Sequence, residues 1–483
     1  MDHASIFSHP AAPPKVCSSF QITIQPTMIV TGWMQALAMA AVAVCISHAW
    51  TVVRWSKGWR KAGKKSHDKV PESRALETPF DDAPPLDSTA HQACFTVVIP
   101  ARNEACRLPR LLEELEAARL KLGLEMNVWV VDDHSEDQTA EVATSQGVNV
   151  LRLETQHGSG AGKKAALLAA MTRVSTPWVV TLDADVSLGL DWASAWQVFL
   201  CEQPRHVAAV AGPVVLQERP SGIGVPTGGR EGESRGGLKG ESRGGRMDWP
   251  DDGPTEGLGD RPNDGQPTGR GEGWWGRVQA LDFATQMGWA AGELGAGRPA
   301  SASGANFAVR PEIYPDTRTS GPSGDDVMVL QRLHAQGWAC RWLHDKDARV
   351  WTPGAANVAS WVAQRLRWAG KTRHYSRHAK KTAWWMATVA ATQVGMVAGA
   401  ALDGSPGAWS MAGATWTLIS ALHIGFARGV VAWFGLRVQT QDWLILALTQ
   451  PLQVPLLVLA KTGLLQPFNI PSKPRWKGRT CDP

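Results

Sequence analysis

The feature that most constrains the fold of this chain is a long apolar stretch near its start. No Lys, Arg, Asp or Glu occurs from Val16 to Val53, and residues 28–53 are long and apolar enough to cross a bilayer as one helix. A cleaved signal peptide carries its charges before the apolar run, whereas here they follow it, so we expect a retained anchor. A buried core helix is the alternative, because Gln35 and His48 interrupt the apolar side chains.

The charges beside the anchor predict its orientation. The residues that follow it are basic: Arg54, Lys57, Arg60, Lys61, Lys64 and Lys65. Basic flanks of membrane helices stay in the cytosol, so we expect the chain beyond residue 53 to face the cytoplasm from the cell (inner) membrane. The seven cysteines are scattered without CxxC pairs, as in a protein whose thiols stay reduced.

Three further apolar stretches lie near the C-terminus, at about 383–402, 408–426 and 443–465. Basic residues precede the first stretch, and the turn sequence at 403–406 separates it from the second, as in a helical hairpin. Pro451 and Pro455 lie in the third, which leaves open whether it is a plain span, a kinked helix or a re-entrant segment. The sequence therefore predicts a multi-pass membrane protein.

Composition divides the remainder of the chain. We expect an N-terminal tail (1–27), the anchor (28–53), a basic flank and linker (54–93), a soluble domain (94–375), membrane segments within 383–465 and a basic tail (466–483). Within the soluble domain, residues 218–273 are rich in Gly, Arg, Pro and Asp, and "GESRGG" occurs there twice. Such a segment cannot bury enough apolar surface to offset its ordering entropy, so we expect a disordered insertion. Interleaved acidic residues disfavour an RGG-like RNA-binding role, and the net charge of +5 gives no sign of a nucleic-acid partner.

Outside the insertion, the soluble domain alternates predicted strands and helices. "FTVVIPA", "NVWVVD", "VNVLRL" and "WVVTL" are typical of buried strands, and "LPRLLEELEAARLKL" has helical spacing of its leucines. This alternation predicts an α/β domain with a parallel sheet covered on both faces. Ligands bind at the carboxyl ends of such strands, where the polar candidates are Arg102, Glu104, Asp133, Asp183 and Asp185.

Asp183 and Asp185 are the strongest candidates, because they follow a buried strand directly. With a side-chain period of two, both carboxylates leave from the same side of the chain. Two like charges so close need a cation or solvent between them. A divalent metal is one interpretation, and a helix N-cap or a solvated turn is the other.

The ordered set of motifs resembles the family 2 glycosyltransferases. "VVIPARNE", "VVDDHSEDQT", "GAGKKAAL", "LDAD", "SGANFAVR", "SGDDVM" and "QRLRW" occur in that family's order and cover most of 95–368 apart from the insertion. With its membrane segments, the chain is similar to the membrane-integral branch that includes ceramide and glycolipid glycosyltransferases and short relatives of polysaccharide synthases. The resemblance implies a GT-A fold, which is a Rossmann-like, mostly parallel sheet, with one N-terminal and about three C-terminal transmembrane helices.

The resemblance also implies a donor site. Asp185 is then the direct ligand of Mg²⁺ or Mn²⁺, and Asp183 lies nearer the ribose while helping to hold the metal. Glu104, Arg102 and Asp133 match the family's contacts to uracil and ribose. Lys163, after "GAG", matches a lysine near the nucleotide, although a solvated helix start is the alternative for it.

Two motifs remain for the acceptor side. Asp326 in "SGDDVM" matches the general base, which removes the proton of the attacking hydroxyl, and Asp325 replaces the Glu that is usual before it. In "QRLRW", Gln364, Arg367 and Trp368 share one helix face; the Arg suits a diphosphate and the indole suits the floor of an acceptor pocket. An amphipathic helix at the membrane surface would show a similar pattern.

We therefore expect an inverting, metal-dependent glycosyltransferase that uses a UDP-sugar and a membrane lipid or glycan acceptor at the cytosolic face of the bilayer. Three alternatives stay open: a processive or short-chain polysaccharide synthase, a nucleotidyltransferase and an inactive membrane scaffold. The Gly-rich triphosphate loop of a nucleotidyltransferase is missing from the first strand. The intact acidic and "QRLRW" motifs disfavour a scaffold.

Overall fold

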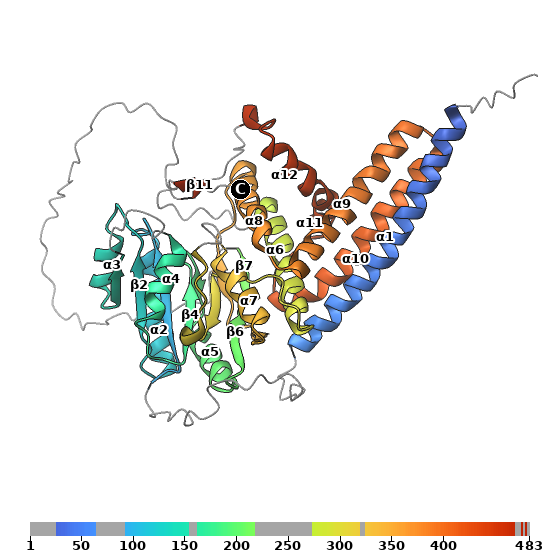
Figure 1. Ribbon diagram of the computed structural model, residues 1–483. Coiled ribbons are helices and arrows are strands. Elements are labelled where there is room, and N and C mark those ends of the chain that lie inside the picture. Colours follow the sequence, from blue (N-terminus) through green and yellow to red (C-terminus); the bar gives the residue numbers. More distant parts are fainter. Residues whose placement is uncertain are drawn as a thin grey trace, which may run out of the picture.

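The computed structural model describes residues 26–63, 92–153, 162–217, 273–318, 324–468, 475–476 and 479–480, with side chains between residues 33 and 467 of these ranges. The expected linker, nearly all of the expected insertion at 218–273 and most of both tails lie outside the described residues. Figure 1 shows two parts, a sheet domain and a group of long helices beside it.

A seven-stranded sheet forms the centre of the described α/β domain. Its strands, in spatial order, are β3 (Asn149–Arg152), β2 (Val128–Asp132), β1 (Phe95–Ala101), β4 (Trp178–Leu182), β8 (Asn306–Val309), β6 (Val207–Ala211) and β9 (Ala339–Trp342). β8 is antiparallel to both neighbours, and the other pairs are parallel. The expected mostly parallel α/β sheet is therefore confirmed.

Helices surround the strands of this domain, and the first of them forms at "LPRLLEELEAARLKL", where the spacing of the leucines predicts a helix. They are α2 (Leu108–Leu122), α3 (Thr139–Ser145), α4 (Lys163–Met171), α5 (Trp192–Cys201) and α7 (Asp325–Ala335). In α2, Leu108, Leu111, Leu112 and Leu115 are all buried, as their helical spacing predicts. α2 packs against α3 and α5, and α4 packs on β1 and β2. The strands between them are buried on both faces, which explains why β1 and β4 are continuous apolar runs.

Short elements complete the domain around the strand ends. A small sheet contains β5 (Ser187–Leu188), β10 (Val350–Thr352) and β7 (Val214–Leu216), in that order. Single 3₁₀ turns lie at Pro311–Ile313 and Lys371–His374. Near the C-terminus, β11 (Arg475–Trp476) pairs with β12 (Arg479–Thr480), and a 3₁₀ turn spans Gln466–Phe468.

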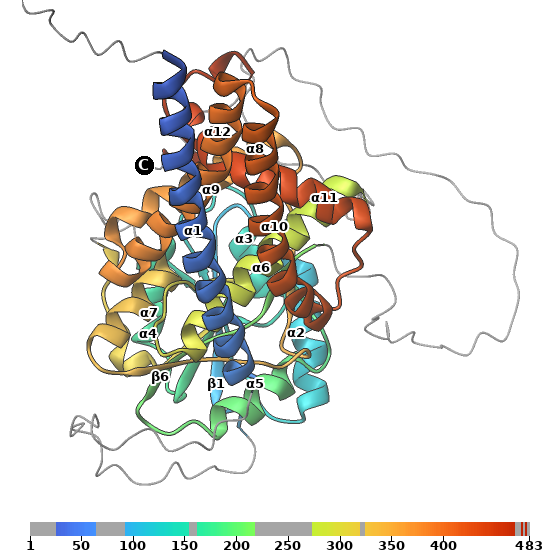
Figure 2. The same cartoon turned by 90° about the vertical axis from the view of Figure 1, so that its right-hand side faces the viewer.

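Among the described residues, four helical segments are long and apolar enough to cross a membrane. α1 (Pro26–Ala62), α9 (Arg377–Asp403) and α10 (Pro406–Phe434) contact one another and run side by side in both views (Figures 1 and 2). The predicted turn between α9 and α10 is present. Gly404 adopts a φ of 74° there, and Ser405 caps α10 by accepting a hydrogen bond from the Ala408 N–H.

The fourth apolar segment is interrupted at its proline. α11 (Thr440–Thr449) is followed by a 3₁₀ turn (Gln450–Leu452) and by α12 (Gln453–Lys461), and Pro451 lies in that turn. In Figure 1, α12 departs from the direction of α1, α9 and α10. The segment is therefore not one regular helix, and whether it crosses the bilayer as a kinked span or re-enters it stays a prediction.

Two helices connect the sheet domain to the long helices. α6 (Trp274–Gly295) packs against α1, α10 and α11 as well as against β7 and β9. α8 (Val358–Gly370) contacts α12 and begins with a capping box, in which Asn357 and Ser360 hydrogen-bond each other's backbone N–H groups. α1 itself continues past the expected anchor to Ala62, so the first part of the basic flank is helical.

Candidate active site

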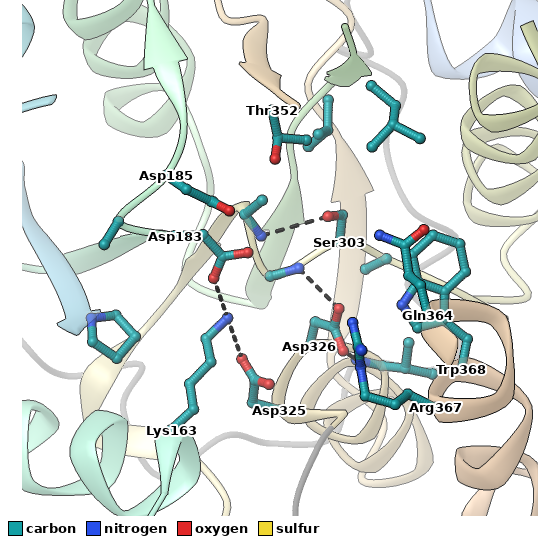
Figure 3. Close-up of a pocket in the computed structure, with 18 of the residues that line it drawn as sticks. Lys163, Asp183, Asp185, Ser303, Asp325, Asp326, Thr352, Gln364, Arg367 and Trp368 are labelled. Atoms are coloured by element: carbon teal, nitrogen blue, oxygen red, sulfur yellow. Dashed lines mark hydrogen bonds and ion pairs between the residues drawn. The ribbon is translucent and has the colours of Figure 1, made fainter. Parts of the chain in front are cut away.

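The predicted site residues line one pocket at the carboxyl ends of β1, β2 and β4. The cavity has a volume of about 650 Å³, and its lining includes every candidate named from the sequence: Arg102, Glu104, Asp133, Lys163, Asp183, Asp185, Asp325, Asp326, Gln364, Arg367 and Trp368. Figure 3 shows the acidic residues around Lys163 on one side and the "QRLRW" side chains on the other. The parallel strands, together with α7 and α8, thus bring together residues that are far apart in the chain.

Lys163 lies between two of the carboxylates. Its Nζ atom is 2.6 Å from Asp183 Oδ1 and 3.1 Å from Asp325 Oδ2, and its side chain is only 15% exposed. Burial opposes the charged ammonium, but Asp183 and Asp325 outweigh it and raise the pKa of Lys163 above its ordinary value. A solvated helix start, the alternative drawn from the sequence, does not fit this burial.

The two aspartates at the start of α7 have different partners. Asp325 is buried, which favours its neutral form, yet the ammonium groups of Lys163 and Lys371 lower its pKa below the ordinary value. Asp326 is oriented by the backbone: Oδ2 accepts from the Gly304 N–H at 2.8 Å and Oδ1 from the Val327 N–H at 2.7 Å. The Asp326 carboxylate is therefore fixed in direction by neutral donors.

The candidates after β1 and β2 form a wall of the pocket next to the start of α4. Asp133 is buried, and its Oδ1 accepts from the Gly162 N–H at 3.0 Å, which joins the end of β2 to the start of α4. The Glu104 backbone N–H donates to Thr139 Oγ1 at 2.8 Å, and the Glu104 carboxylate contacts Arg107 at 3.1 Å. Hydrogen bonds between the two loops therefore hold the acidic groups of this wall in place.

Next to the pocket, α8 carries a further residue that the sequence analysis missed. Arg365, between the predicted Gln364 and Arg367, is buried and ion-paired with Asp282 of α6. Its guanidinium lies 4.8 Å from the ring centre of Trp368, which fits a cation–π contact. Arg365 thus packs against the ring of Trp368 and helps to fix its position. Its only signal in the sequence was its position inside "QRLRW".

Other lining residues were also not predicted. Phe283, Gln286, Met287 and Trp289 all come from α6, which follows the expected insertion, and Tyr375 precedes α9. Gly304 lies in the quoted "SGANFAVR" motif. A Cβ at that position would be 2.9 Å from Asp325 Oδ2 and 3.0 Å from Lys163 Nζ, so a glycine lets the backbone approach the charged groups.

The residues present fit a metal held chiefly by its substrate. Among the described residues, no group of three or more His, Cys, Asp or Glu side chains is placed to hold an ion. Mg²⁺ commonly uses one or two carboxylates together with substrate phosphates. Asp185 and Asp183 provide such a pair of carboxylates at the pocket, and Asp183 also forms an ion pair with Lys163. That Asp185 is the direct ligand, with Asp183 helping to hold the metal, stays a prediction.

Comparison with known proteins agrees with the motifs. Residues 96–225 match the sequence model described as "Glycosyl transferase family 2". A 4-deoxy-4-formamido-L-arabinose transferase from Pseudomonas aeruginosa, which acts on undecaprenyl phosphate, is 39% identical over 95 residues, 19% of this chain and 27% of that protein. A 4,4'-diaponeurosporenoate glycosyltransferase from Staphylococcus haemolyticus is 33% identical over 101 residues, 20% of this chain and 26% of that protein.

The chain thus spans about a quarter of the length of these relatives. Among solved structures, a mannosyltransferase from Pyrobaculum calidifontis in complex with GDP-Man and Mn²⁺ covers 88% of this chain and 99% of its own, with a TM-score of 0.44 and 18% identity. The resemblance recognised in the motifs is confirmed by the family match and by the observed sheet. Over residues 96–225 the chain is therefore similar to the family 2 glycosyltransferases, the family that the motifs indicated, and these residues form part of the mostly parallel sheet.

Proposed function

We propose that this protein is an inverting, metal-dependent glycosyltransferase that moves a sugar from a UDP-sugar to a membrane lipid at the cytosolic face of the bilayer. The observation that carries the proposal is that all the candidate residues named from the sequence line the same pocket. Its strand-end side offers carboxylates and Lys163 for a charged donor. Its α6 and α8 side offers aromatic and apolar groups for the acceptor, next to helices long enough to span a membrane.

The proposed reaction is an in-line displacement. The acceptor hydroxyl attacks the anomeric carbon, the bond from that carbon to the diphosphate oxygen breaks, and UDP leaves from the opposite face, which inverts the configuration. Asp326 takes the proton of the hydroxyl, and its fixed orientation keeps one carboxylate aimed at the attacking group.

The remaining residues would act on the donor and on the leaving group. A divalent cation at Asp185 and Asp183 would neutralise charge on the departing diphosphate. Arg367 would bind the diphosphate oxygens from α8, and Trp368 would stack on the acceptor. Glu104, Arg102 and Asp133 would bind the base and ribose. Lys163 would keep Asp183 and Asp325 charged and in position.

A lipid acceptor is supported by two observations. Two of the similar proteins are named for undecaprenyl phosphate and for 4,4'-diaponeurosporenoate, which are long hydrocarbon chains that carry an acidic group. The α8 helix also contacts α12, whose Val458 and Leu459 are exposed as on a lipid-facing surface. A hydroxyl presented at the cytosolic leaflet needs no channel through the bilayer.

The test is the release of UDP by purified full-length protein from a panel of UDP-sugars, with and without extracted membrane lipids. The proposal expects release from at least one UDP-sugar, stimulated by lipid and abolished by chelation of divalent cations. Absence of release from every UDP-sugar would contradict it.

A further inference from the structure

Two sets of residues on α6 contact different parts of the protein. Phe283, Met287 and Trp289 line the pocket. Gly292 and Gly295 instead lie against α1: a Cβ on Gly295 would be 2.1 Å from the carbonyl oxygen of Gly58, and a Cβ on Gly58 would be 1.9 Å from the carbonyl oxygen of Gly292. The two helices therefore meet backbone to backbone, with no room for a side chain. The membrane anchor and the pocket wall form one packed unit.

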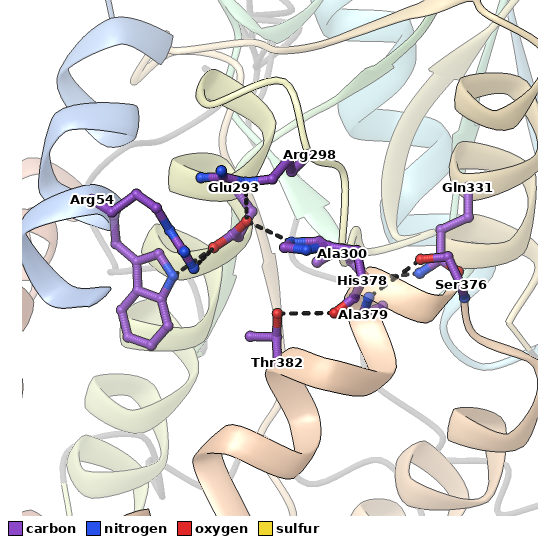
Figure 4. A network of polar contacts seen from close by, with 10 residues as sticks. Arg54, Glu293, Arg298, Ala300, Gln331, Ser376, His378, Ala379 and Thr382 are labelled. Carbon is purple, nitrogen blue, oxygen red and sulfur yellow. Dashed lines mark hydrogen bonds and ion pairs between the residues drawn. The ribbon is translucent and has the colours of Figure 1, made fainter. Parts of the chain in front are cut away.

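Glu293 lies at this junction and is 0% exposed. Its Oε1 accepts from Trp55 Nε1 at 2.7 Å and from Arg54 at 3.1 Å, both at the basic end of α1. Its Oε2 contacts His378 Nε2 at 2.8 Å, in the first turn of α9, and accepts from Arg298 at 3.3 Å. Figure 4 shows Glu293 between the Arg54 side and the His378 side. One buried carboxylate thus links α6 to two membrane helices.

The negative charge of Glu293 is stabilised by the groups around it. Burial would raise the pKa of Glu293, but its bonds to His378, Arg54 and Trp55 lower it to about 2. Removing a partner would leave a buried charge uncompensated, which is strongly destabilising. The Glu293 carboxylate therefore favours the arrangement in which Arg54, Trp55 and His378 stay in contact with it.

Two routes lead from Glu293 to the pocket. On the α1 side, the Trp55 ring packs edge-on against the Trp289 ring, with centroids 6.3 Å apart, and Trp289 lines the pocket. On the α9 side, Ser376, two residues before His378, donates its backbone N–H to Gln331 Oε1 at 2.6 Å. Gln331 Nε2 in turn donates to the Ala300 carbonyl at 2.9 Å, and the next residues, 301–305, line the pocket.

We propose that Glu293 is a positioning residue for acceptor binding, which acts by holding the cytosolic ends of α1 and α9 against α6 and through Trp55 on Trp289. The anchor helix is then part of the acceptor side of the pocket as well as an attachment to the membrane. This inference rests on the proposed function, because it assigns the α6 face to the acceptor.

The test compares Glu293→Gln and Trp55→Phe with wild type, using the full chain in lipid nanodiscs. Glu293→Gln keeps the size of the side chain and removes its charge, and Trp55→Phe keeps an aromatic ring but removes the indole N–H that donates to Glu293 and part of the ring that packs on Trp289. We expect the KM for the lipid acceptor to rise by roughly 2- to 30-fold, with the KM for the UDP-sugar and the UDP-sugar hydrolysis rate within about twofold of wild type. Glu116→Gln, which removes an exposed ion pair with Arg119 on α2, is the matched control and should change none of these values.

Hydrogen–deuterium exchange provides a readout that needs no acceptor. In Glu293→Gln, peptides covering 281–291 of α6 should exchange faster, whereas peptides covering 108–122 of α2 should not change. An unchanged acceptor KM together with unchanged exchange in α6 would overturn the proposal, and so would an equal rise in both KM values. If Glu293→Gln fails to fold, Trp55→Phe decides by the same criteria. Failure of the proposed function would be seen separately, as a wild-type protein that transfers nothing to lipid while the α6 exchange effect persists.

Discussion

Lys163 Nζ lies 2.6 Å from Asp183 Oδ1, on the boundary between the start of α4 and the end of β4. This contact joins two motifs that are twenty residues apart and places a fixed positive charge beside the expected metal site. The same ammonium also reaches Asp325, so it connects the donor side of the pocket to the residue next to the proposed base.

The first prediction concerns that lysine. Lys163→Met leaves Asp183 and Asp325 without their shared cation, so the KM for the donor should rise roughly 10- to 100-fold, the worth of a charge-assisted hydrogen bond. Lys121→Met is the matched control, because Lys121 also lies 2.6 Å from an aspartate, Asp191, but on the exposed surface. Steady-state kinetics of both variants check this. Equal effects would show that Lys163 has no special role.

A second prediction separates the proposed metal ligand from the proposed base. Asp185→Asn should weaken Mg²⁺- or Mn²⁺-dependent binding of UDP, because it removes a charge that the cation needs. Asp326→Asn should leave UDP binding intact and slow transfer by roughly two to four orders of magnitude, the usual contribution of a positioned base. Calorimetric titration with UDP, with and without metal, measures the difference. If the two variants lost nucleotide affinity equally, the assignment of separate roles would be wrong.

The third prediction concerns the buried ion pair between Arg365 and Asp282. Arg365→Leu leaves Asp282 buried without a cation, which should cost roughly 3–5 kcal/mol of stability. The double variant Arg365→Leu with Asp282→Leu should recover part of that loss. Thermal unfolding of purified protein reports both values, and a double variant less stable than the single one would contradict the account.

The fourth prediction is a pH dependence. The pKa of Glu293 in the folded protein is about 2, below the ordinary value of 4.5, so its ionisation stabilises the folded state by on the order of 3 kcal/mol. That contribution is fully present above pH 4.5 and is lost as the pH falls through about 2. Between about pH 5 and pH 3, the Tm of the wild type should therefore fall more steeply than that of Glu293→Gln. Parallel curves would show that folding does not lower the pKa of Glu293.

Much of the domain and its pocket could be predicted because the signals are local. A buried strand that ends on carboxylates, as at Asp183 and Asp185, fixes both the strand and the face on which its ligand side chains lie. Asp326 and Trp368 were found through short motifs, and α7 and α8 place them in the same pocket as the candidates at the strand ends. Their chemical roles remain predictions.

The interior contacts of α6 could not be predicted. Asp282 and Glu293 are isolated acidic residues in a mostly apolar helix, and their partners lie 83 and 239 residues away in sequence at Arg365 and Arg54. No spacing within the helix indicates such partners, and only the tertiary packing shows that both carboxylates are buried and paired. The same holds for the contact of Gly58 with Gly292, since a glycine in a helix has no pattern of its own.

The most direct test of the central claim is the fate of the transferred sugar. Purified full-length protein is incubated with labelled UDP-sugar, Mg²⁺ or Mn²⁺ and extracted membrane lipids, and the organic and aqueous products are then separated. Our account predicts label in the organic phase, as one sugar or very few on each lipid, with Asp326→Asn as the inactive control. Label that accumulates in a long water-soluble polymer, with none in the lipid phase, would contradict it and favour a processive polysaccharide synthase.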